Sequence, residues 1–490
     1  MSKFNNTVTN TTTNRSGSVA YKMNDKERLV CAALTSMFCE PKFYGSTDND
    51  IVTLATELCQ KGEGEFVAKL AIYARTVFNM RSVSHVLTAI VAHETTGSGI
   101  IRTLIPAVCV RADDMLEITG AYEKMYGKPF PNGMKRGLAE AMMKFNEYQY
   151  AKYNGGNKEF KFTDLLRICH PKALTSTKAE LFGKILSDTL ETPYTWEVEL
   201  SRSGNTKEVW DALIESNHLG YMAMLRNLRN MYIKDVDMTP VLKKLADPIE
   251  VAKSKQFPFR FYAAYREIDK FTQPKKNDIL LALNKALEAS VENMEKIDGR
   301  TLIAVDVSGS MGSRISSRSD VTCRDIAELF GAMSSRLCED ATVIYFNSAA
   351  SYSWNRIDKK GYKVEHYGKW DNIMANVGTH GCGGGTDMSI PLMYALNEVT
   401  DKPFDRVIYF SDNENNAQQR TMQGLADKYR RDKNPNFWVH AVDLQGYGTQ
   451  QFCGEKFNLI AGWDESVWSF INMAEKGFGS LVDSIEAMSL

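Results

Sequence analysis

Several features are scarce or missing in this sequence of 490 residues, and each absence excludes a class of protein. The nine cysteines are scattered singly, with no Cys-x-x-Cys pair and no metal-ligand spacing, which argues against a disulfide framework and a cysteine-based metal site. No apolar run resembles a signal peptide or a membrane span. We therefore expect a reduced, soluble, cytoplasmic protein that makes no contact with a membrane.

A strong excess of one charge is also missing, since the net charge is −1, but the charges are unevenly distributed. Residues 301–490 contain 18 Lys and Arg against 24 Asp and Glu, a balance of −6, whereas residues 1–300 contain 41 against 36, a balance of +5. An excess of +5 over 300 residues is as compatible with chance variation on solvated surfaces as with an anionic ligand. It gains meaning only if a second feature indicates such a ligand.

The first part of the chain is dominated by the helical period. Residues 1–20 are rich in Asn, Thr and Ser, and we expect a flexible arm there. From residue 21 to residue 297, apolar side chains recur at helical spacing, as in Ile51, Leu54 and Leu58, and short breakers such as "KGEG" separate the helices. Many helices joined by short breakers suggest stacked helix pairs of the HEAT type, although no fixed repeat period is visible.

Residues 298–490 show a different pattern. The runs "TLIAVD", "ATVIYF", "RVIYFSD" and "FWVHAVD" are short, apolar and rich in β-branched or aromatic residues, as expected for strands buried on both faces of a parallel sheet. Helical stretches at 324–337, 390–399 and 421–431 lie between or beside them. This alternation predicts a doubly wound, Rossmann-like α/β domain, and therefore a multidomain chain of α plus α/β class.

Oxygen-bearing side chains follow the strands of this predicted sheet. "DVSGSMG" places Asp306, Ser308 and Ser310 at alternate positions directly after a strand, "GGGTDMS" offers Thr386, and "IYFSDNE" offers Asp412. In doubly wound sheets ligands bind at the carboxyl ends of the strands, and hard divalent cations prefer oxygen ligands. Each piece alone is compatible with an ordinary turn, but the three together predict a site for a divalent metal, Mg²⁺ or alternatively Mn²⁺.

These motifs resemble the metal-ion-dependent adhesion site, or MIDAS, of von Willebrand factor A domains, which residues 300–490 resemble throughout. The resemblance implies that Ser308, Ser310 and Thr386 supply hydroxyl ligands, while Asp306 and Asp412 bind directly or through water. Integrin-type sites commonly have glycine after the last Asp, whereas this chain has "SDNEN". This difference from the integrin-type pattern argues against an extracellular adhesion role.

The helical part resembles the TROVE module of Ro autoantigen-type RNA-binding proteins and their bacterial relatives. The segments that carry this resemblance are "EPKFYGSTDNDI", "KFTDLLRICHPK", "LGYMAMLRNLRNM" and "FPFRFYAAYREI". Together with the A domain, the resemblance covers nearly the whole chain. It implies a ring of helical repeats that binds Y RNAs on its outer surface and admits single-stranded ends of defective RNAs to its central hole.

A basic segment between residues 134 and 172 has the residue types that RNA binding requires, cations for phosphates and aromatic rings for bases. Spacing alone favours a plainer interpretation, with the aromatic residues in a helix core and the lysines on a solvated face. The resemblance favours RNA contact, because "AKY" and "RICHPK" match family segments implicated in Y RNA binding. The predicted RNA-binding residues are Lys135, Arg136, Lys152, Arg167, His170 and Lys172.

No catalytic constellation is apparent. His170 has no nucleophile or paired carboxylate beside it in sequence, Cys382 has no neighbouring base or second cysteine, and a hydroxyl-rich shell with Asp306 and Asp412 has fewer carboxylates than two-metal nuclease chemistry uses. We expect a noncatalytic, monomeric scaffold that binds Y-like small noncoding RNA and ends of misfolded RNA in RNA quality control or processing. A 3′ exoribonuclease is a possible partner, and a metal-dependent protein-binding adaptor is the alternative function.

Overall fold

The chain is described here by a computed structural model. The described residues are 11–13, 19–35, 50–154, 159–292, 294–315, 319–348, 361–369, 371–399, 401–416, 422–445, 449–461, 466–476 and 481–490. They form two compact units. Asp25–Asn205 and Val482–Leu490 make up the helical unit, and Met1–Asn24 and Thr206–Leu481 make up the mixed unit.

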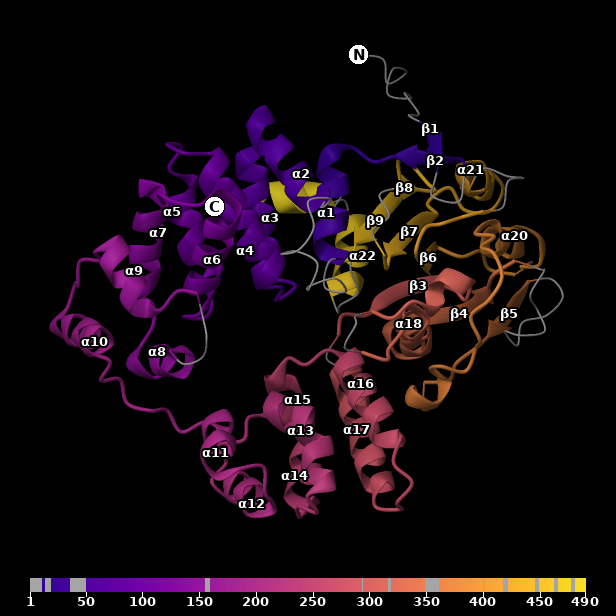
Figure 1. Cartoon of the computed structure of the whole chain (residues 1–490). Coiled ribbons are helices and arrows are strands. Elements are labelled where there is room, and N and C mark those ends of the chain that lie inside the picture. The colour runs from indigo at the N-terminus through magenta and orange to yellow at the C-terminus, as the bar shows by residue number, and fades with distance from the viewer. Residues whose placement is uncertain are drawn as a thin grey trace. The chain divides into compact units, whose positions relative to one another are not determined.

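The helical unit consists of short helices joined by turns (Figure 1). Its helices are α1 (Asp25–Thr35), α2 (Asp50–Leu58), α3 (Gly64–Thr76), α4 (Ser82–Glu94), α5 (Ile100–Val108), α6 (Asp114–Tyr126), α7 (Asn132–Met142), α8 (Glu147–Tyr153), α9 (Phe162–Cys169), α10 (Ser176–Ser187) and α11 (Trp196–Ser203), and α23 (Leu481–Glu486) ends in it. Helices α3 and α4 pack on each other, and α4 on α6, α5 on α7 and α7 on α9, so that successive pairs stack.

The predicted apolar faces of this unit are confirmed. Ile51, Leu54 and Leu58 of α2 are buried. The breaker "KGEG" coincides with a π-helical turn, η4 (Cys59–Glu63), where Gly62 adopts φ of +90°, a conformation that a residue with a Cβ rarely adopts. The period of the apolar residues and the glycine that interrupts it therefore define where α2 ends and α3 begins.

From Thr206 onward, the mixed unit consists of further helices followed by a sheet. The helices are α12 (Lys207–Glu215), α13 (Tyr221–Ile233), α14 (Thr239–Leu245), α15 (Pro248–Ser254), α16 (Pro258–Asp269) and α17 (Lys276–Glu292). The sheet has the order β5-β4-β3-β6-β7-β9, made of β3 (Ile297–Asp306), β4 (Cys338–Phe346), β5 (Tyr362–Glu365), β6 (Arg406–Ser411), β7 (Trp438–Asp443) and β9 (Phe457–Ala461). The helices of this α/β part are α18 (Cys323–Leu337), α20 (Ser389–Asn397), α21 (Met422–Asp432) and α22 (Ser466–Glu475).

The predicted doubly wound parallel sheet is confirmed, with two additions. Strands β4, β3, β6, β7 and β9 run parallel, whereas β5 is antiparallel at the edge, and neither β5 nor β9 was expected from the sequence. Helices cover both faces. On one face Phe330 of α18 stacks on Phe410 at a ring-centroid distance of 4.6 Å, and on the other α20 and α21 enclose a continuous apolar cluster.

The described part of residues 1–20 differs from the expected flexible arm. Strand β1 (Thr11–Thr13) pairs with β2 (Val19–Lys22), and β2 pairs with β8 (Thr449–Gln450), all antiparallel. A low content of large apolar residues suggested an arm, but β-branched threonine and valine favour extended backbone when a neighbouring strand offers hydrogen bonds. The change from helices to sheet falls at Ile297, the start of β3, and the predicted boundary between residues 297 and 298 remains a prediction.

No helix in the described ranges is both long enough and apolar enough to cross a bilayer.

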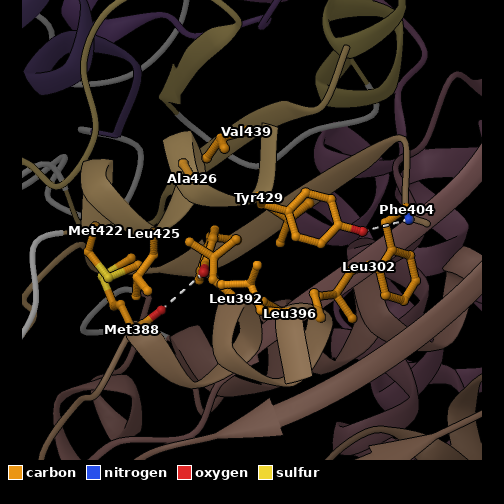
Figure 2. Close-up of a cluster of buried hydrophobic side chains, with 14 of the residues drawn as sticks. Leu302, Met388, Leu392, Leu396, Phe404, Met422, Leu425, Ala426, Tyr429 and Val439 are labelled. Atoms are coloured by element: carbon orange, nitrogen blue, oxygen red, sulfur yellow. Dashed lines mark hydrogen bonds between the residues drawn. The ribbon is translucent and has the colours of Figure 1, made fainter. Parts of the chain in front are cut away.

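The core between the sheet, α20 and α21 is closely packed. Figure 2 shows Leu392 and Leu396 of α20 beside Leu425 and Tyr429 of α21, and the backbone N–H of Phe404 donates a hydrogen bond of 2.8 Å to the Tyr429 hydroxyl. This core holds α20 against the sheet, and α20 directly follows the loop that carries Thr386.

We expect Leu392→Ala to destabilise this domain by about 2–5 kcal/mol, because it removes buried methyl groups and leaves a cavity. Hydrogen exchange of the β6 amides measures the effect. Leu281→Ala on α17 is the matched control, because Leu281 is 55% exposed and a surface substitution of this kind changes stability by about 0.5 kcal/mol or less. Equal effects of the two substitutions would contradict this description of the core.

Candidate metal centre and basic surface

The first loop of the candidate metal centre begins at Asp306, the last residue of β3. The pairing of Val305 with Phe410 places Asp306 beside Ser411 at the carboxyl ends of β3 and β6. Asp306 is fully buried, and its Oδ1 accepts a hydrogen bond of 2.8 Å from the backbone N–H of Ser308, while its Oδ2 accepts one of 2.6 Å from Ser411 Oγ. The carboxylate is therefore fixed by both its own loop and the neighbouring strand.

A second loop, which carries Thr386, is bonded to the first by backbone hydrogen bonds. The N–H of Gly383 donates to the carbonyl of Val307 at 3.1 Å, and the N–H of Gly309 donates to the carbonyl of Gly384 at 3.1 Å. These bonds hold the second loop, and with it Thr386, against the first loop. Thr386 itself is buried.

The third loop follows β6 and contains Asp412. Asn416 links it to the second loop, because its Oδ1 accepts a hydrogen bond of 2.7 Å from Thr386 N–H and its own N–H donates one of 3.0 Å to the Thr386 carbonyl. A Cβ on Gly385 would lie 2.7 Å from Asn416 Oδ1, so any larger residue there would displace the Asn416 side chain that accepts this bond. The three loops thus form one hydrogen-bonded assembly.

All five predicted metal-site residues lie at the carboxyl end of the sheet on these connected loops. Asp306, Ser308, Thr386 and Asp412 are buried, and Ser310 is exposed, with its Oγ 3.2 Å from Ser308 Oγ. Four of the five side chains of the site are therefore buried, and one lies at the surface. This is an arrangement that a partner's side chain could reach.

The electrostatics of this site favour a cation. Burial and the nearby charge of Asp412 raise the pKa of Asp306 well above its ordinary value. Two carboxylates beside each other in a buried position repel, and a divalent ion would offset both the repulsion and the lost hydration. The described residues contain no group of three or more His, Cys, Asp or Glu suited to a metal, so a cation here would rely on two carboxylates and neutral hydroxyls. That donor set fits a hard ion such as Mg²⁺.

The sequence pattern did not indicate the residues that support this site, namely Ser411, Asn416 and Glu328. Glu328, on the buried face of α18, accepts hydrogen bonds from the backbone N–H groups of Gly378, Thr379 and His380, the last two at 3.1 Å each. It anchors the start of the loop that continues to Thr386. The only signal in the sequence was an acidic residue inside an apolar helix, which does not by itself indicate a partner.

The predicted RNA-binding residues lie on three consecutive helices of the helical unit. Lys135 and Arg136 are on α7, Lys152 is on α8, and Arg167 is in the last turn of α9. All of these except Lys135, which is half-buried, are exposed. Helix α7 packs on α9, and Lys135 lies close enough to Cys169 for its charge to oppose the effect of burial, which raises the pKa of the thiol to about 12.

The two remaining residues follow α9. His170 ends this helix in a left-handed conformation with φ of +45°, and both His170 and Lys172 are exposed. A left-handed residue at a helix end directs the following chain away from the helix axis. We call the six residues together the α7–α9 surface.

The aromatic residues of the basic segment divide between core and surface. Phe145 and Tyr150 are buried, as the plainer interpretation of the spacing predicted, whereas Tyr148 is 50% exposed. Tyr153 is half-buried, with the Arg111 guanidinium 4.4 Å and the Lys152 ammonium 5.7 Å from its ring centroid. Only some of the aromatic side chains that could stack on RNA bases therefore lie at the surface.

The cations of this region also differ in whether they are neutralised. The side chains of Arg136 and Arg167 make no ion pair or hydrogen bond with any residue that the structure describes, whereas those of Arg81 and Arg111 pair with Asp113. An exposed guanidinium without a carboxylate is available to an external anion. Lys144 has a structural role, because its Nζ donates hydrogen bonds to two backbone carbonyls, and Lys158 lies outside the described residues.

Comparison with known proteins gives consistent results for both parts of the chain. The family model of the TROVE domain matches residues 10–192 and 188–314, and that of the Ro60 vWA domain matches residues 300–472. The chain shares its fold with the crystal structure of the Deinococcus radiodurans RO (RSR) protein, with a TM-score of 0.64 and 17% identity, over 93% of this chain and 100% of that one.

Curated relatives match over smaller shares. Telomerase protein component 1 of Mus musculus is 25% identical over 329 residues, 49% of this chain and 12% of that protein. RNA-binding protein RO60 of Caenorhabditis elegans is 26% identical over 240 residues, 46% of this chain and 35% of that protein. The chain thus spans well under half the length of either relative.

We expect Glu328→Gln to loosen the loop that carries Thr386. The glutamine side chain has an NH₂ group in place of one carboxylate oxygen, and this group cannot accept a hydrogen bond. At least one buried backbone N–H of the loop would then lack an acceptor, which costs about 1–3 kcal/mol of stability. Hydrogen exchange at residues 378–386 should become faster. Asp427→Asn on α21, where the side chain is exposed, is the control and should leave these amides unchanged. Unchanged exchange in Glu328→Gln would show that Glu328 does not anchor the loop.

Proposed function

Because this chain belongs to the family of TROVE-domain proteins with a Ro60-type von Willebrand factor A domain, we propose that it binds RNA through the α7–α9 surface. The observation that carries this proposal is the group of exposed basic side chains on α7, α8 and α9, of which Arg136 and Arg167 have no carboxylate partner among the described residues. Phosphate oxygens are the ligands that suit such guanidinium groups.

The RNA that we propose is a small, structured, Y-like noncoding RNA, with ends of misfolded RNA as a second class. The family resemblance and the name of the RO60 relative support an RNA ligand. Exposed cations on three consecutive helices suit a folded RNA, which is recognised mainly through its shape and backbone. The cellular task that we propose is RNA quality control or processing.

We propose that the protein acts as a scaffold rather than as an enzyme. His170, the one histidine of the α7–α9 surface, makes no hydrogen bond with a carboxylate in the described part of the chain, and general acid–base catalysis requires such positioning. Activities on the RNA would then come from a bound partner, for which a 3′ exoribonuclease is our candidate.

For the A domain we propose a divalent cation, Mg²⁺ or Mn²⁺, held by Asp306, Ser308, Ser310, Thr386 and Asp412. Such an ion would supply an electrophilic position that accepts one further carboxylate. The fixed loops and the exposed Ser310 would leave that position open toward solvent. The balance of −6 over residues 301–490 disfavours RNA phosphate there, so we propose an Asp or Glu of a protein partner.

A metal-dependent protein-binding adaptor remains the second candidate function. The observation that favours this second function is the hydrogen-bonded assembly of three loops around two buried carboxylates. These hydrogen bonds hold potential metal ligands together, which suits a binding site. In this case the helices would dock proteins, and RNA would bind weakly and without a localised surface.

We expect Lys152→Ala to weaken binding of structured RNA and to reduce the log–log salt slope by about 0.7 to 0.9, the contribution of one phosphate contact. Filter binding over a series of KCl concentrations measures both quantities. Arg102→Ala is the matched control, because Arg102 is an exposed arginine of the same unit that pairs with Glu140. A slope in Lys152→Ala equal to that of the parent would place the RNA elsewhere.

His170→Ala should also weaken binding of structured RNA, but its backbone must be controlled. Alanine is strained at φ of +45°, whereas glycine adopts this conformation freely. His170→Gly should therefore show the same loss of affinity in the same assay. A loss in the alanine variant alone would indicate a backbone effect and remove His170 from the α7–α9 surface.

We expect Asp306→Ala or Ser308→Ala to abolish Mg²⁺ and Mn²⁺ binding in calorimetry, because each removes a ligand from a small shell, and to leave RNA binding intact. Ser313→Ala, at an exposed serine of the same segment, is the control. In pull-downs from the host, the parent protein should capture partner proteins that a chelator releases. Thr386→Ala should fail to capture the same proteins. Undiminished metal binding in Asp306→Ala would refute the site.

A further inference from the structure

Asn413 directly follows Asp412 on the third loop of the candidate metal centre, and hydrogen bonds fix its backbone on both sides. Its N–H donates a hydrogen bond of 3.1 Å to Ser411 Oγ. The same hydroxyl donates one of 2.6 Å to Asp306 Oδ2. On the other side, Gln451 Nε2 donates a hydrogen bond of 3.0 Å to the Asn413 carbonyl. Asn413 is therefore held next to one buried carboxylate in sequence and one hydroxyl group away from the other in space.

The side chain of Asn413 is buried without hydrogen bonds. Asn413 is 1% exposed, and neither its Oδ1 nor its Nδ2 has a hydrogen-bond partner in the part of the chain that the structure describes. The nearby Asn415 is also buried, but its Oδ1 accepts a hydrogen bond of 3.2 Å from Met388 N–H. Burying an amide without hydrogen bonds is costly, and such a group in a native structure usually faces water or an ion.

The backbone of Asn413 does not account for the choice of asparagine. Its φ is +57°, in the left-handed region that glycine adopts without strain and asparagine adopts more readily than most other residues. Glycine would make the same turn and would bury no amide. The carboxamide is therefore not needed to shape the loop, and its position beside Asp412 suggests a role toward what the site binds.

The chemistry of a hydrated cation supplies that role. Mg²⁺ prefers six oxygen ligands in octahedral geometry and usually keeps several waters. Where Asp306 or Asp412 acts through such a water, one hydrogen of the water donates to the carboxylate and the second requires another acceptor. An amide oxygen is suitable, because it accepts a hydrogen bond without adding a third negative charge to a buried site. Groups that act on a metal centre in this way orient its ligands and raise its affinity.

We propose that Asn413 is a sixth residue of the metal centre, and that its side-chain oxygen accepts a hydrogen bond from water around the cation. Asn413 is then a positioning residue, because it contacts this water and not the ion. The proposal rests on the proposed cation site and adds to it a preference for an ion that retains water. Mg²⁺ does so, whereas Ca²⁺ takes more of its ligands directly from protein oxygens.

The test is calorimetry of Mg²⁺ binding to the full chain and to two variants. Asn413→Gly keeps the left-handed backbone and removes the carboxamide, and it should lower the affinity for Mg²⁺ by about 10-fold or more and that for Ca²⁺ by less. Asn413→Asp keeps an acceptor oxygen and should bind Mg²⁺ at least as tightly as the parent. Asn217→Gly is the matched control, because Asn217 is exposed and is also left-handed, with φ of +55°.

Thermal unfolding in the presence of a chelator provides a second measurement. If Asn413 served the fold, Asn413→Gly would lower the unfolding temperature of the metal-free protein. We expect a temperature equal to or above that of the parent, because the variant no longer buries an amide without hydrogen bonds. A lower temperature would overturn the proposal.

The outcomes separate this inference from the proposed function. If the parent binds no Mg²⁺, the proposed cation site itself fails. If the parent binds Mg²⁺ and Asn413→Gly binds it equally well, the inference alone is wrong, and the amide faces only an internal water. If Asn413→Gly and Asn413→Asp lose the same affinity, the amide nitrogen and not the oxygen is the group that matters, which also overturns the proposal.

Discussion

The burial of two neighbouring carboxylates at the end of a parallel sheet is the constraint on which the α/β part depends. Asp306 ends β3 and Asp412 follows β6, and the hydrogen-bond register places these two strands side by side. Buried like charges are tolerated only where hydrogen bonds or a cation offset them. Ser308 N–H and Ser411 Oγ supply such bonds to Asp306, while burial and the charge of Asp412 raise the pKa of this carboxyl.

Much of the surrounding structure serves to hold these carboxylates and hydroxyls in place. Asn416 joins the second and third loops, and Glu328 holds the start of the second from α18. Neither residue is among the proposed ligands, and each acts through the backbone of a loop. Their hydrogen bonds help to fix the arrangement of the three loops.

A second principle organises the surface. Several exposed arginines in the described structure are paired with a nearby carboxylate, as Arg102 is with Glu140, and such pairs contribute little to stability because both groups remain hydrated. The side chains of Arg136 and Arg167 make no such pair with a described residue. Unpaired cations keep their full attraction for a polyanion, so a nearly neutral chain can bind RNA through a few local surfaces.

The sequence predicted those features that depend on local pattern. The β-branched runs identified β3, β4, β6 and β7, and the spacing of Asp306, Ser308 and Ser310 after a strand located the candidate metal site. It did not predict β5 and β9, whose pairing partners are distant in sequence, or the hairpin of β1 and β2, which depends on β8. Whether an arginine is paired, as Arg111 is and Arg136 is not, depends on tertiary contacts that periodicity does not contain.

The central claim is that RNA is bound where exposed cations lack carboxylate partners. The most direct test is ultraviolet cross-linking of bound RNA to the full chain, followed by mass spectrometry of the peptides. The account predicts cross-links in peptides from α7–α9 for structured RNA, with none around Asp306 and Asp412. Cross-links concentrated in residues 298–490, with α7–α9 unlabelled, would contradict it.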